Sequence, residues 1–240
     1  MFPSFSHSRQ NGNRSSAAIL RRNVPLKDRK DVQNDFTKSS SEKRNETPAK
    51  VSIVHDSVLK RIHEGKLGNG YGCDVSKEVA YTLDDAEHSL KQINNLEKNA
   101  KPEAVVVHVG TNDLKRSDEK KSAQKCVQII TKFAKENPDI KVIYSKVTPT
   151  KKVEINKKRH IFNTQVTTGI CDSGLKNVFA INHEYLRSYD LYDDVHPNIR
   201  GDRKLAVHIG RVLWGMFWTA STRRRQKQQE AWWAENVIHY

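Results

Sequence analysis

The stretch AVVVHVG, residues 104–110, decides the fold class of this 240-residue chain. Four of its seven residues are valine, a β-branched residue that favours strands. The run is apolar almost throughout rather than alternating, which is typical of a strand buried on both faces of a parallel sheet. We therefore expect a strand here, followed by a loop that begins with Gly-Thr-Asn-Asp.

Short apolar runs and longer amphipathic segments alternate on both sides of this strand. Further strands are expected at 51–55, 74–81, 140–147 and 177–181. Helices are expected at 84–99, 117–136, 153–171 and about 201–218. Strands that alternate with helices of this length predict a parallel α/β sheet covered by helices on both faces.

The two ends of the chain differ in composition from the middle. We expect a disordered basic tail at 1–49, one folded domain at 50–219 and a basic tail at 220–240 that contains Trp232 and Trp233. The net charge is +14; residues 1–50 hold 11 Lys or Arg and 5 Asp or Glu, and residues 221–240 hold 4 and 2. Basic tails attract polyanions, so nucleic acid is a possible partner, and solubility alone is the alternative.

Several classes of protein are excluded by what the sequence lacks. No apolar run approaches the roughly 20 residues of a membrane-spanning helix. The first residues lack the apolar block of a secretory signal, so the chain as written is expected in the cytoplasm or nucleus. Three distant cysteines (Cys73, Cys126 and Cys171) do not suit a disulfide scaffold or a zinc finger. The histidines have no ligand spacing, and no metal site is expected.

Three loops of the predicted sheet carry reactive side chains. In a parallel α/β sheet, function collects at the carboxyl ends of the strands. His55–Asp56–Ser57 follows the first strand, Gly110–Thr111–Asn112–Asp113 follows the third, and Asp193–Asp194–Val195–His196–Pro197–Asn198 follows the last. Serine, asparagine, aspartate and histidine are therefore expected at one edge of the sheet.

This combination of side chains suits nucleophilic acyl transfer. A serine becomes a good nucleophile only when an imidazole takes its proton, and the imidazole needs an acid to fix its tautomer. Asp193 and His196 are three residues apart, so one turn can aim the carboxylate at the ring while the ring reaches Ser57. The Asn112 amide can donate to the oxyanion that forms in the transition state.

Each of these residues also has an ordinary structural interpretation. Ser57 could cap a turn or helix, Asn112 could simply form a bend, and His196 could be a surface histidine. Asp194 is the rival of Asp193 as the orienting acid. The joint occurrence of all the roles at one sheet edge favours the catalytic interpretation, with Asp193 preferred on spacing.

Three segments resemble a known family. VSIVHDSVLKRI (51–62), VVVHVGTNDL (105–114) and YDDVHPN (192–198) resemble blocks one, three and five of the SGNH (GDSL-type) hydrolases, in the family's order. The resemblance extends from about Val51 to Trp218. It implies a three-layer α/β/α, flavodoxin-like fold and an ester hydrolase or deacylase without metal or cofactor.

The resemblance also assigns roles to individual residues. It implies that Ser57 is the nucleophile, His196 the general base and acid, and Asp193 the acid that orients the histidine. Asn112 and the backbone amide of Ser57 would serve the oxyanion hole.

The remaining family positions are matched only in part. Asp56 would fix the nucleophile loop, and the glycine that usually precedes Asp-Ser is His55 here. Gly110 would allow the turn that presents Asn112. Block two normally adds a glycine amide to the oxyanion hole; Ala80–Tyr81–Thr82 aligns with it by distance, and Gly72 is an earlier candidate. Loss of one such donor costs about 10²–10³ in rate.

Details such as IVHDSVLKRI and AYTLDDAE look most like the esterase-like modules of retrotransposon ORF1 proteins and related invertebrate proteins. Two functions are therefore expected as alternatives. The first is an intracellular serine hydrolase acting on an acyl ester of unknown identity, with loops 61–80 and 147–153 shaping the substrate site. The second is a mobile-element-derived module of the same fold with little catalysis, whose basic tails associate with nucleic acid.

Overall fold

A computed structural model describes residues 48–217 of the chain, which form one five-stranded parallel sheet in the order β2-β1-β3-β4-β5. Every neighbouring pair of strands is parallel, as the sequence pattern predicts. The strands are β1 (Ala49–His55), β2 (Cys73–Val79), β3 (Ala104–His108), β4 (Lys141–Ser145) and β5 (Val178–Ile181).

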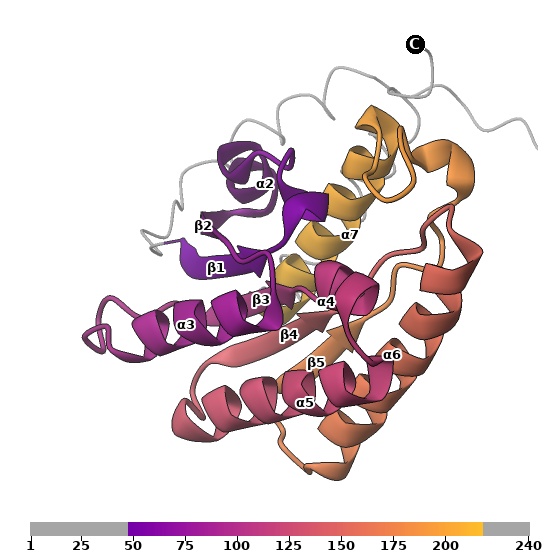
Figure 1. Ribbon diagram of the computed structural model, residues 1–240. Coiled ribbons are helices and arrows are strands. Elements are labelled where there is room, and N and C mark those ends of the chain that lie inside the picture. Colours follow the sequence, from indigo (N-terminus) through magenta and orange to yellow (C-terminus); the bar gives the residue numbers. More distant parts are fainter. Residues whose placement is uncertain (1–47, 218–240) are drawn as a thin grey trace, which may run out of the picture. The chain divides into compact units, whose positions relative to one another are not determined.

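Helices cover both faces of this sheet (Figure 1). One face is covered by α3, α5 and α6, and the other by α2 and α7, so the sheet is the middle of three layers. The helices are α2 (Glu64–Tyr71), α3 (Leu83–Asn94), α4 (Thr111–Arg116), α5 (Glu119–Glu136), α6 (Val153–Asp172) and α7 (Ile199–Phe217). Two short 3-10 helices complete the fold, η1 (Ser57–Leu59) and η2 (Ser188–Asp190). The expected three-layer α/β/α class is confirmed.

The core lies on the two faces of the sheet, and β3 contributes to both. All five residues of β3 are buried. Because successive side chains of a strand point to opposite faces, Val105 and Val107 join the apolar cluster under α3, α5 and α6, while Ala104 and Val106 join the one under α2 and α7. This two-sided burial explains why the stretch from Ala104 is an unbroken apolar run.

Two helices were not expected from the sequence. The segment of α2 contains three glycines, which are poor helix formers, and only Leu67 and Gly68 of it are buried. A Cβ on Gly68 would lie 2.5 Å from the carbonyl oxygen of Cys73, so the glycine lets α2 pack closely against β2. The other unexpected helix, α4, starts directly at Thr111 within the expected loop.

The element boundaries also differ slightly from those expected. β1 begins at Ala49, one residue inside the expected tail, and α3 ends at Asn94 rather than near residue 99. The remainder of both expected tails, including Trp232 and Trp233, lies outside the described residues.

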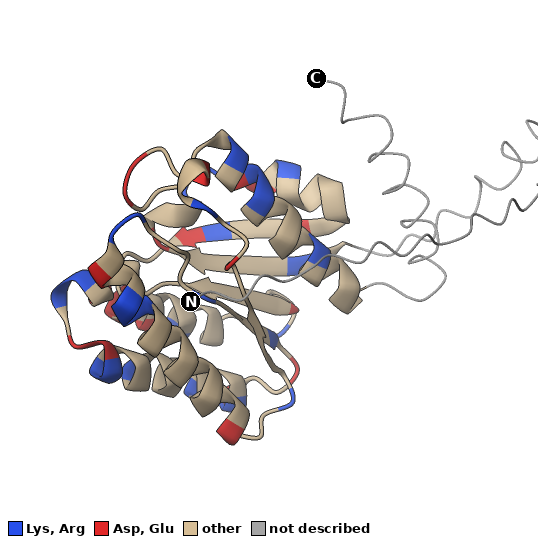
Figure 2. Ribbon diagram, turned by 90° about the vertical axis from the view of Figure 1, so that its right-hand side faces the viewer, with Lys and Arg blue, Asp and Glu red and all other residues tan. Residues whose placement is uncertain are grey.

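Lys, Arg, Asp and Glu residues lie mainly on the helices and loops of the domain, with both signs interspersed along the ribbon (Figure 2). Neither β3 nor β5 contains a Lys, Arg, Asp or Glu residue. Within residues 48–217, no helix combines the length and the apolar character needed to cross a membrane.

The strand register brings three loops together at the carboxyl edge of the sheet. His55 at the end of β1 pairs with Val79 on β2 and with His108 on β3. The chain remains tied together just beyond these ends, because the Asp56 amide donates to the His108 carbonyl at 2.9 Å and the Ala80 amide donates to the His55 carbonyl at 2.8 Å. Side chains in the following loops are therefore held at fixed positions relative to one another.

Candidate active site

Ser57 is the first residue of η1 and lies immediately beyond the end of β1. Asp56 caps this short helix: its backbone is extended and its Oδ1 accepts a hydrogen bond from the Val58 amide at 2.9 Å. The Asp56 side chain is fully buried, whereas Ser57 is only half-buried. The turn therefore anchors one residue in the core and leaves the next hydroxyl accessible.

His196 lies between Ser57 and Asp193. Its Nε2 is 2.9 Å from Ser57 Oγ, and its Nδ1 is 2.7 Å from Asp193 Oδ2. A carboxylate can only accept, so Nδ1 carries a proton and Nε2 presents its lone pair to the serine hydroxyl. We refer to Asp193, His196 and Ser57 as the outer array. Its histidine and aspartate side chains are 29% and 43% exposed, so the array is open to solvent.

Asp193 is held as an acceptor by its own turn. Its Oδ1 accepts hydrogen bonds from the amides of Val195 at 2.8 Å and His196 at 2.6 Å. Burial opposes ionisation of this carboxyl, but the two amides and the imidazole outweigh it and hold its pKa well below the ordinary value. Asp194, the rival candidate, pairs instead with Lys152 Nζ at 3.1 Å.

The loop that carries His196 is held by Arg61, which follows the Ser57 turn and was not predicted as a site residue. The Arg61 guanidinium donates to the Pro197 carbonyl and forms an ion pair with Asp202 at 3.0 Å. It also lies 4.7 Å from the ring centre of Tyr192, whose ring stacks on that of His196 with centroids 5.8 Å apart. The bond from Arg61 to the Pro197 carbonyl joins residues 136 positions apart in the sequence, so no local pattern predicts it.

Asn112 is presented by the turn between β3 and α4. Gly110 has φ +119°, and a Cβ there would lie 2.9 Å from the Phe162 ring, so the position requires glycine. One N–H of the Asn112 amide donates to the Tyr81 carbonyl at 3.0 Å, and its Oδ1 accepts from Lys115 at 3.2 Å. Because a primary amide has two N–H groups, one remains beyond the bond to Tyr81.

The structure does not bring Gly72 to this site. Gly72 is the left-handed C-cap of α2 (φ +66°) and precedes β2, so it lies at the amino edge of the sheet. Six residue steps separate Cys73 from Val79, which at about 3.3 Å each places Gly72 roughly 20 Å from the carboxyl edge. The prediction that Gly72 donates to the oxyanion hole is therefore wrong.

The loop after β2 offers only one open backbone amide in place of the missing glycine. The Ala80 amide is bonded to the His55 carbonyl, and the Thr82 amide to Asp85 Oδ2 at 3.0 Å. The Tyr81 amide donates to none of the described residues. Tyr81 is thus the position in this loop with a donor to spare.

His55 fits where the family usually has glycine because its backbone continues β1. Its ring is buried and its Nδ1 lies 2.6 Å from the Asp56 carbonyl oxygen. Burial lowers the pKa of this imidazole, and the nearby Lys77 adds to the effect. His55 is thus a core residue behind the Ser57 turn.

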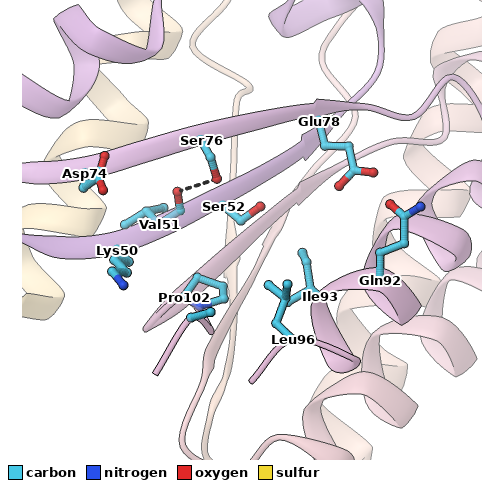
Figure 3. A pocket seen from close by; sticks show the side chains of 11 residues that line it. Lys50, Val51, Ser52, Asp74, Ser76, Glu78, Gln92, Ile93, Leu96 and Pro102 are labelled. Atoms are coloured by element: carbon cyan, nitrogen blue, oxygen red, sulfur yellow. Dashed lines mark hydrogen bonds between the residues drawn. The ribbon is translucent and has the colours of Figure 1, made fainter. Parts of the chain in front are cut away.

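A groove between the β1–β2 edge and the end of α3 is separate from the outer array (Figure 3). Lys50 and Ser52 from β1, Asp74 and Ser76 from β2, and Leu96 are among its lining residues. None of Ser57, Asn112, Asp193 and His196 lines it. Across residues 48–217, no group of three or more His, Cys, Asp or Glu side chains is arranged to hold a metal ion.

The fold recurs in solved structures of low sequence identity. A carbohydrate esterase family 3 protein from Talaromyces cellulolyticus superposes with a TM-score of 0.55 at 19% identity, covering 70% of this chain and 97% of that one. A G-D-S-L family lipolytic protein from Veillonella parvula gives 0.55 at 15% identity, covering 67% and 95%. A putative platelet activating factor from Streptococcus pneumonia gives 0.56 at 16% identity, covering 76% and 91%.

Comparison by sequence gives a family but no individual relative. No curated protein matches the chain. The model of the GDSL-like lipase/acylhydrolase family matches residues 66–209, which include Asn112, Asp193 and His196 and begin after Ser57. Because this match covers more than half of the sequence, the chain belongs to the GDSL-like lipase/acylhydrolase family.

Proposed function

We propose that this protein is a serine hydrolase that cleaves carboxylic esters through an acyl-enzyme intermediate on Ser57. The observation that carries the proposal is the continuous hydrogen-bonded line of the outer array, 2.7 Å from Asp193 to His196 and 2.9 Å from His196 to Ser57. This is the arrangement in which a general base can take the proton of a serine hydroxyl while a carboxylate fixes the tautomer of the base.

The proposed reaction has two matched halves. Ser57 Oγ attacks the ester carbonyl carbon while its proton moves to His196 Nε2. The tetrahedral intermediate collapses, the alkoxide leaves with that proton as an alcohol, and the acyl group remains on Oγ. Water then attacks the acyl-enzyme with His196 again taking and returning the proton, which yields the carboxylic acid and free Ser57. Asp193 stabilises the imidazolium in both halves.

The oxyanion that forms on the carbonyl oxygen needs donors beside Ser57. The candidates are the Ser57 amide, the remaining N–H of Asn112 and the Tyr81 amide, which takes the place of the family's block-two glycine. The burial of Asp56 and the bond from Asn112 to the Tyr81 carbonyl support this set, because they fix the two loops that would supply the donors. Such preorganised donors are worth most when they need not reorient during the reaction.

The test is labelling of the full chain by a fluorophosphonate probe, with the modified residue mapped by mass spectrometry, alongside hydrolysis of p-nitrophenyl acetate. We expect Ser57 to be labelled and Ser57→Ala to lose both labelling and hydrolysis. Ser117→Ala, which changes an exposed serine at the end of α4, is the matched control and should behave as the natural chain. A folded natural chain that is not labelled, or labelling that persists in Ser57→Ala, would overturn the proposal.

A further inference from the structure

A second set of aspartate, histidine and serine lies directly behind the outer array. Asp56 follows β1, His108 ends β3 and Ser145 ends β4, and all three side chains are 0% exposed. His108 Nδ1 lies 2.9 Å from Ser145 Oγ, and His108 Nε2 lies 3.9 Å from Asp56 Oδ1. We refer to these three residues as the inner array. Its serine cannot meet a substrate, so the inner array needs an explanation other than catalysis.

The inner array continues as a chain of hydrogen bonds toward α7. Ser145 Oγ is 2.8 Å from His183 Nε2, and His183 Nδ1 is 3.1 Å from the Tyr185 hydroxyl. The same hydroxyl is 3.1 Å from Nδ1 of His208, a partly exposed residue of α7. The hydrogen-bond chain thus runs from His108, whose Nε2 lies 3.9 Å from the Asp56 carboxylate, to the partly exposed His208 of α7.

Burial lowers the pKa of each histidine in this hydrogen-bond chain, His108, His183 and His208, which favours the neutral ring. Burial lowers the pKa of His108, against the opposing effect of Asp56, and burial lowers that of His183 well below its ordinary value. The pKa of His208 is lowered by burial and by Arg211. A neutral imidazole has one donor and one acceptor nitrogen, so each ring can pass a hydrogen bond on in only one direction at a time.

Three proton arrangements satisfy the links of this hydrogen-bond chain, because the Ser145 hydroxyl can donate to either histidine or accept from both. In the first, each group donates toward the sheet interior: Tyr185 to His183, His183 to Ser145, and Ser145 to His108. The Nε2 proton of His108 then faces the Asp56 carboxylate. In the second, every bond is reversed, and in the third both His108 and His183 donate to Ser145. Either one turns the Nε2 lone pair of His108 toward the carboxylate of Asp56, 3.9 Å away, and Nε2 has no hydrogen bond to any of the described residues. Electrostatic repulsion between this lone pair and a buried carboxylate disfavours the second and third arrangements.

We propose that this chain fixes the Nε2-protonated tautomer of His108, and that His108 thereby holds the Asp56 carboxylate in place to cap the Ser57 turn. His108 is then a positioning residue that acts on the nucleophile through Asp56. The effect on reactivity rests on the proposed function of Ser57, whereas the tautomer itself does not.

The Ser145 hydroxyl is the link whose removal separates the two halves of the chain. Without it, the only partner left for His108 Nδ1 is the backbone carbonyl of residue 145, which lies 3.1 Å away and can only accept. The ring must then place its proton on Nδ1, and Nε2 loses the proton that faces Asp56. Removal of one buried hydroxyl should therefore switch the tautomer of a histidine on the neighbouring strand.

The first arm of the test measures the tautomer by long-range ¹H–¹⁵N NMR of the full chain labelled with ¹⁵N-histidine. The His108 signal is assigned by its loss in His108→Gln. We expect the Nε2–H tautomer in the natural chain and Nδ1–H in Ser145→Ala. Ser122→Ala removes a buried hydroxyl on α5 outside the chain and should leave the tautomer unchanged. An Nδ1–H tautomer in the natural chain, or no switch in a folded Ser145→Ala, would overturn the proposal.

The second arm compares the rate of fluorophosphonate labelling and the values of kcat and KM for p-nitrophenyl acetate. Ser145→Ala should lower kcat and the labelling rate about tenfold with KM unchanged, a fraction of the roughly 10²–10³ that complete loss of an oxyanion donor costs. Ser122→Ala should change neither. A switched tautomer with labelling within twofold of the natural rate would overturn the positioning role. If the natural protein is not labelled at all, the proposed function fails. The NMR measurement then still determines in which direction the hydrogen bonds from Tyr185 to His108 run.

Discussion

His196 and His108 face the same two kinds of side chain at the same edge of one sheet, each ring lying between an aspartate and a serine. The His196 ring is 29% exposed, and its links are 2.9 Å to Ser57 and 2.7 Å to Asp193. The His108 ring is fully buried, with its aspartate 3.9 Å away and a serine that already contacts a second histidine.

Residue type alone does not decide which of the two histidines can perform chemistry. The serine of the outer array has no second imidazole partner among the described residues and lies in a half-buried turn, so its hydroxyl can approach a substrate. The serine of the inner array is fully buried and lies within hydrogen-bond distance of two histidines, so it can only hold its neighbours in place. Under the proposed function, the same three residue types serve reactivity in one place and rigidity in the other.

Replacement of the carboxylate of the outer array should lower activity more than replacement of any residue outside that array. Asp193→Asn retains the shape of the loop but presents an amide to His196 Nδ1, which favours the wrong tautomer. We expect kcat for p-nitrophenyl acetate to fall by about 10³–10⁴, as for the equivalent change in serine proteases. Asp194→Asn is the matched control, because that carboxylate pairs with Lys152, and it should change kcat less than threefold. Equal losses in both variants would contradict the assignment of Asp193.

A smaller loss is expected from the donor that faces the developing oxyanion. Asn112→Ala should lower kcat by about 10²–10³ with little change in KM, because the interaction forms mainly in the transition state. Lys115→Ala is the control, because it removes the ammonium group that donates to Asn112 Oδ1 and leaves the Asn112 amide in place. We expect kcat of this variant to stay near the natural value. A rise in KM with unchanged kcat in Asn112→Ala would assign the residue to ground-state binding.

The sequence predicts where Ser57 and Asn112 lie because one topological rule suffices for both. The segments 51–55 and 104–110 are recognisable as strands, and parallel strands bring their carboxyl ends to one edge, where Ser57 and Asn112 must then lie. The wrong placement of Gly72 has an equally physical cause. The glycine-rich helix α2 occupies residues 64–71 and is stabilised by tertiary packing, so Gly72 comes before β2 and not after it.

The inner array was beyond reach of the sequence for a different reason. His108 and His183 have no ligand spacing, and no pattern in the sequence distinguishes them from the other histidines. Their roles come from hydrogen bonds to Ser145, which lies 37 and 38 residues away from them in the sequence. Only the packed sheet shows that these groups meet and that none is free to bind a substrate. The expected association with nucleic acid depends mainly on tails outside the described residues and stays a prediction.

The turn that supports Asn112 should be sensitive to two separable effects. Gly110→Ala places a Cβ at φ +119° and 2.9 Å from the Phe162 ring, so it combines backbone strain with a clash. Gly174→Ala also has a positive φ, +67°, but its Cβ would meet nothing within 4 Å. We expect about 1–2 kcal/mol of destabilisation from strain in the control, and a further 1–3 kcal/mol from overpacking in Gly110→Ala. Urea unfolding measures both, and equal losses would show that the Phe162 contact relaxes freely.

The smallest effect concerns stability against pH, and it separates the buried histidines from the exposed ones. His108 and His183 have lowered pKa values in the folded chain, so below about pH 6.5 the unfolded chain binds protons that the folded chain does not. The free energy of unfolding should therefore be fully present above pH 7 and decline as the pH falls, by up to about 1.4 kcal/mol per pH unit for each such histidine. The lowered pKa of Asp193 gives a loss of stability in the same direction, but only below its unfolded value of about 3.9, so it does not contribute to the decline between about pH 7 and pH 5.5.

Urea midpoints at pH 7.5, 6.5 and 5.5 measure this slope. His183→Gln removes one group that takes up a proton on unfolding. The free energy of unfolding of this variant should therefore fall less steeply with decreasing pH than that of the natural chain, by the contribution of about one proton. His160→Gln, which replaces an exposed ring on α6, is the matched control and should reproduce the natural slope. An unchanged slope in a folded His183→Gln would mean that His183 takes up its proton in the folded chain. This result would contradict the contrast between a buried inner array and an exposed outer array.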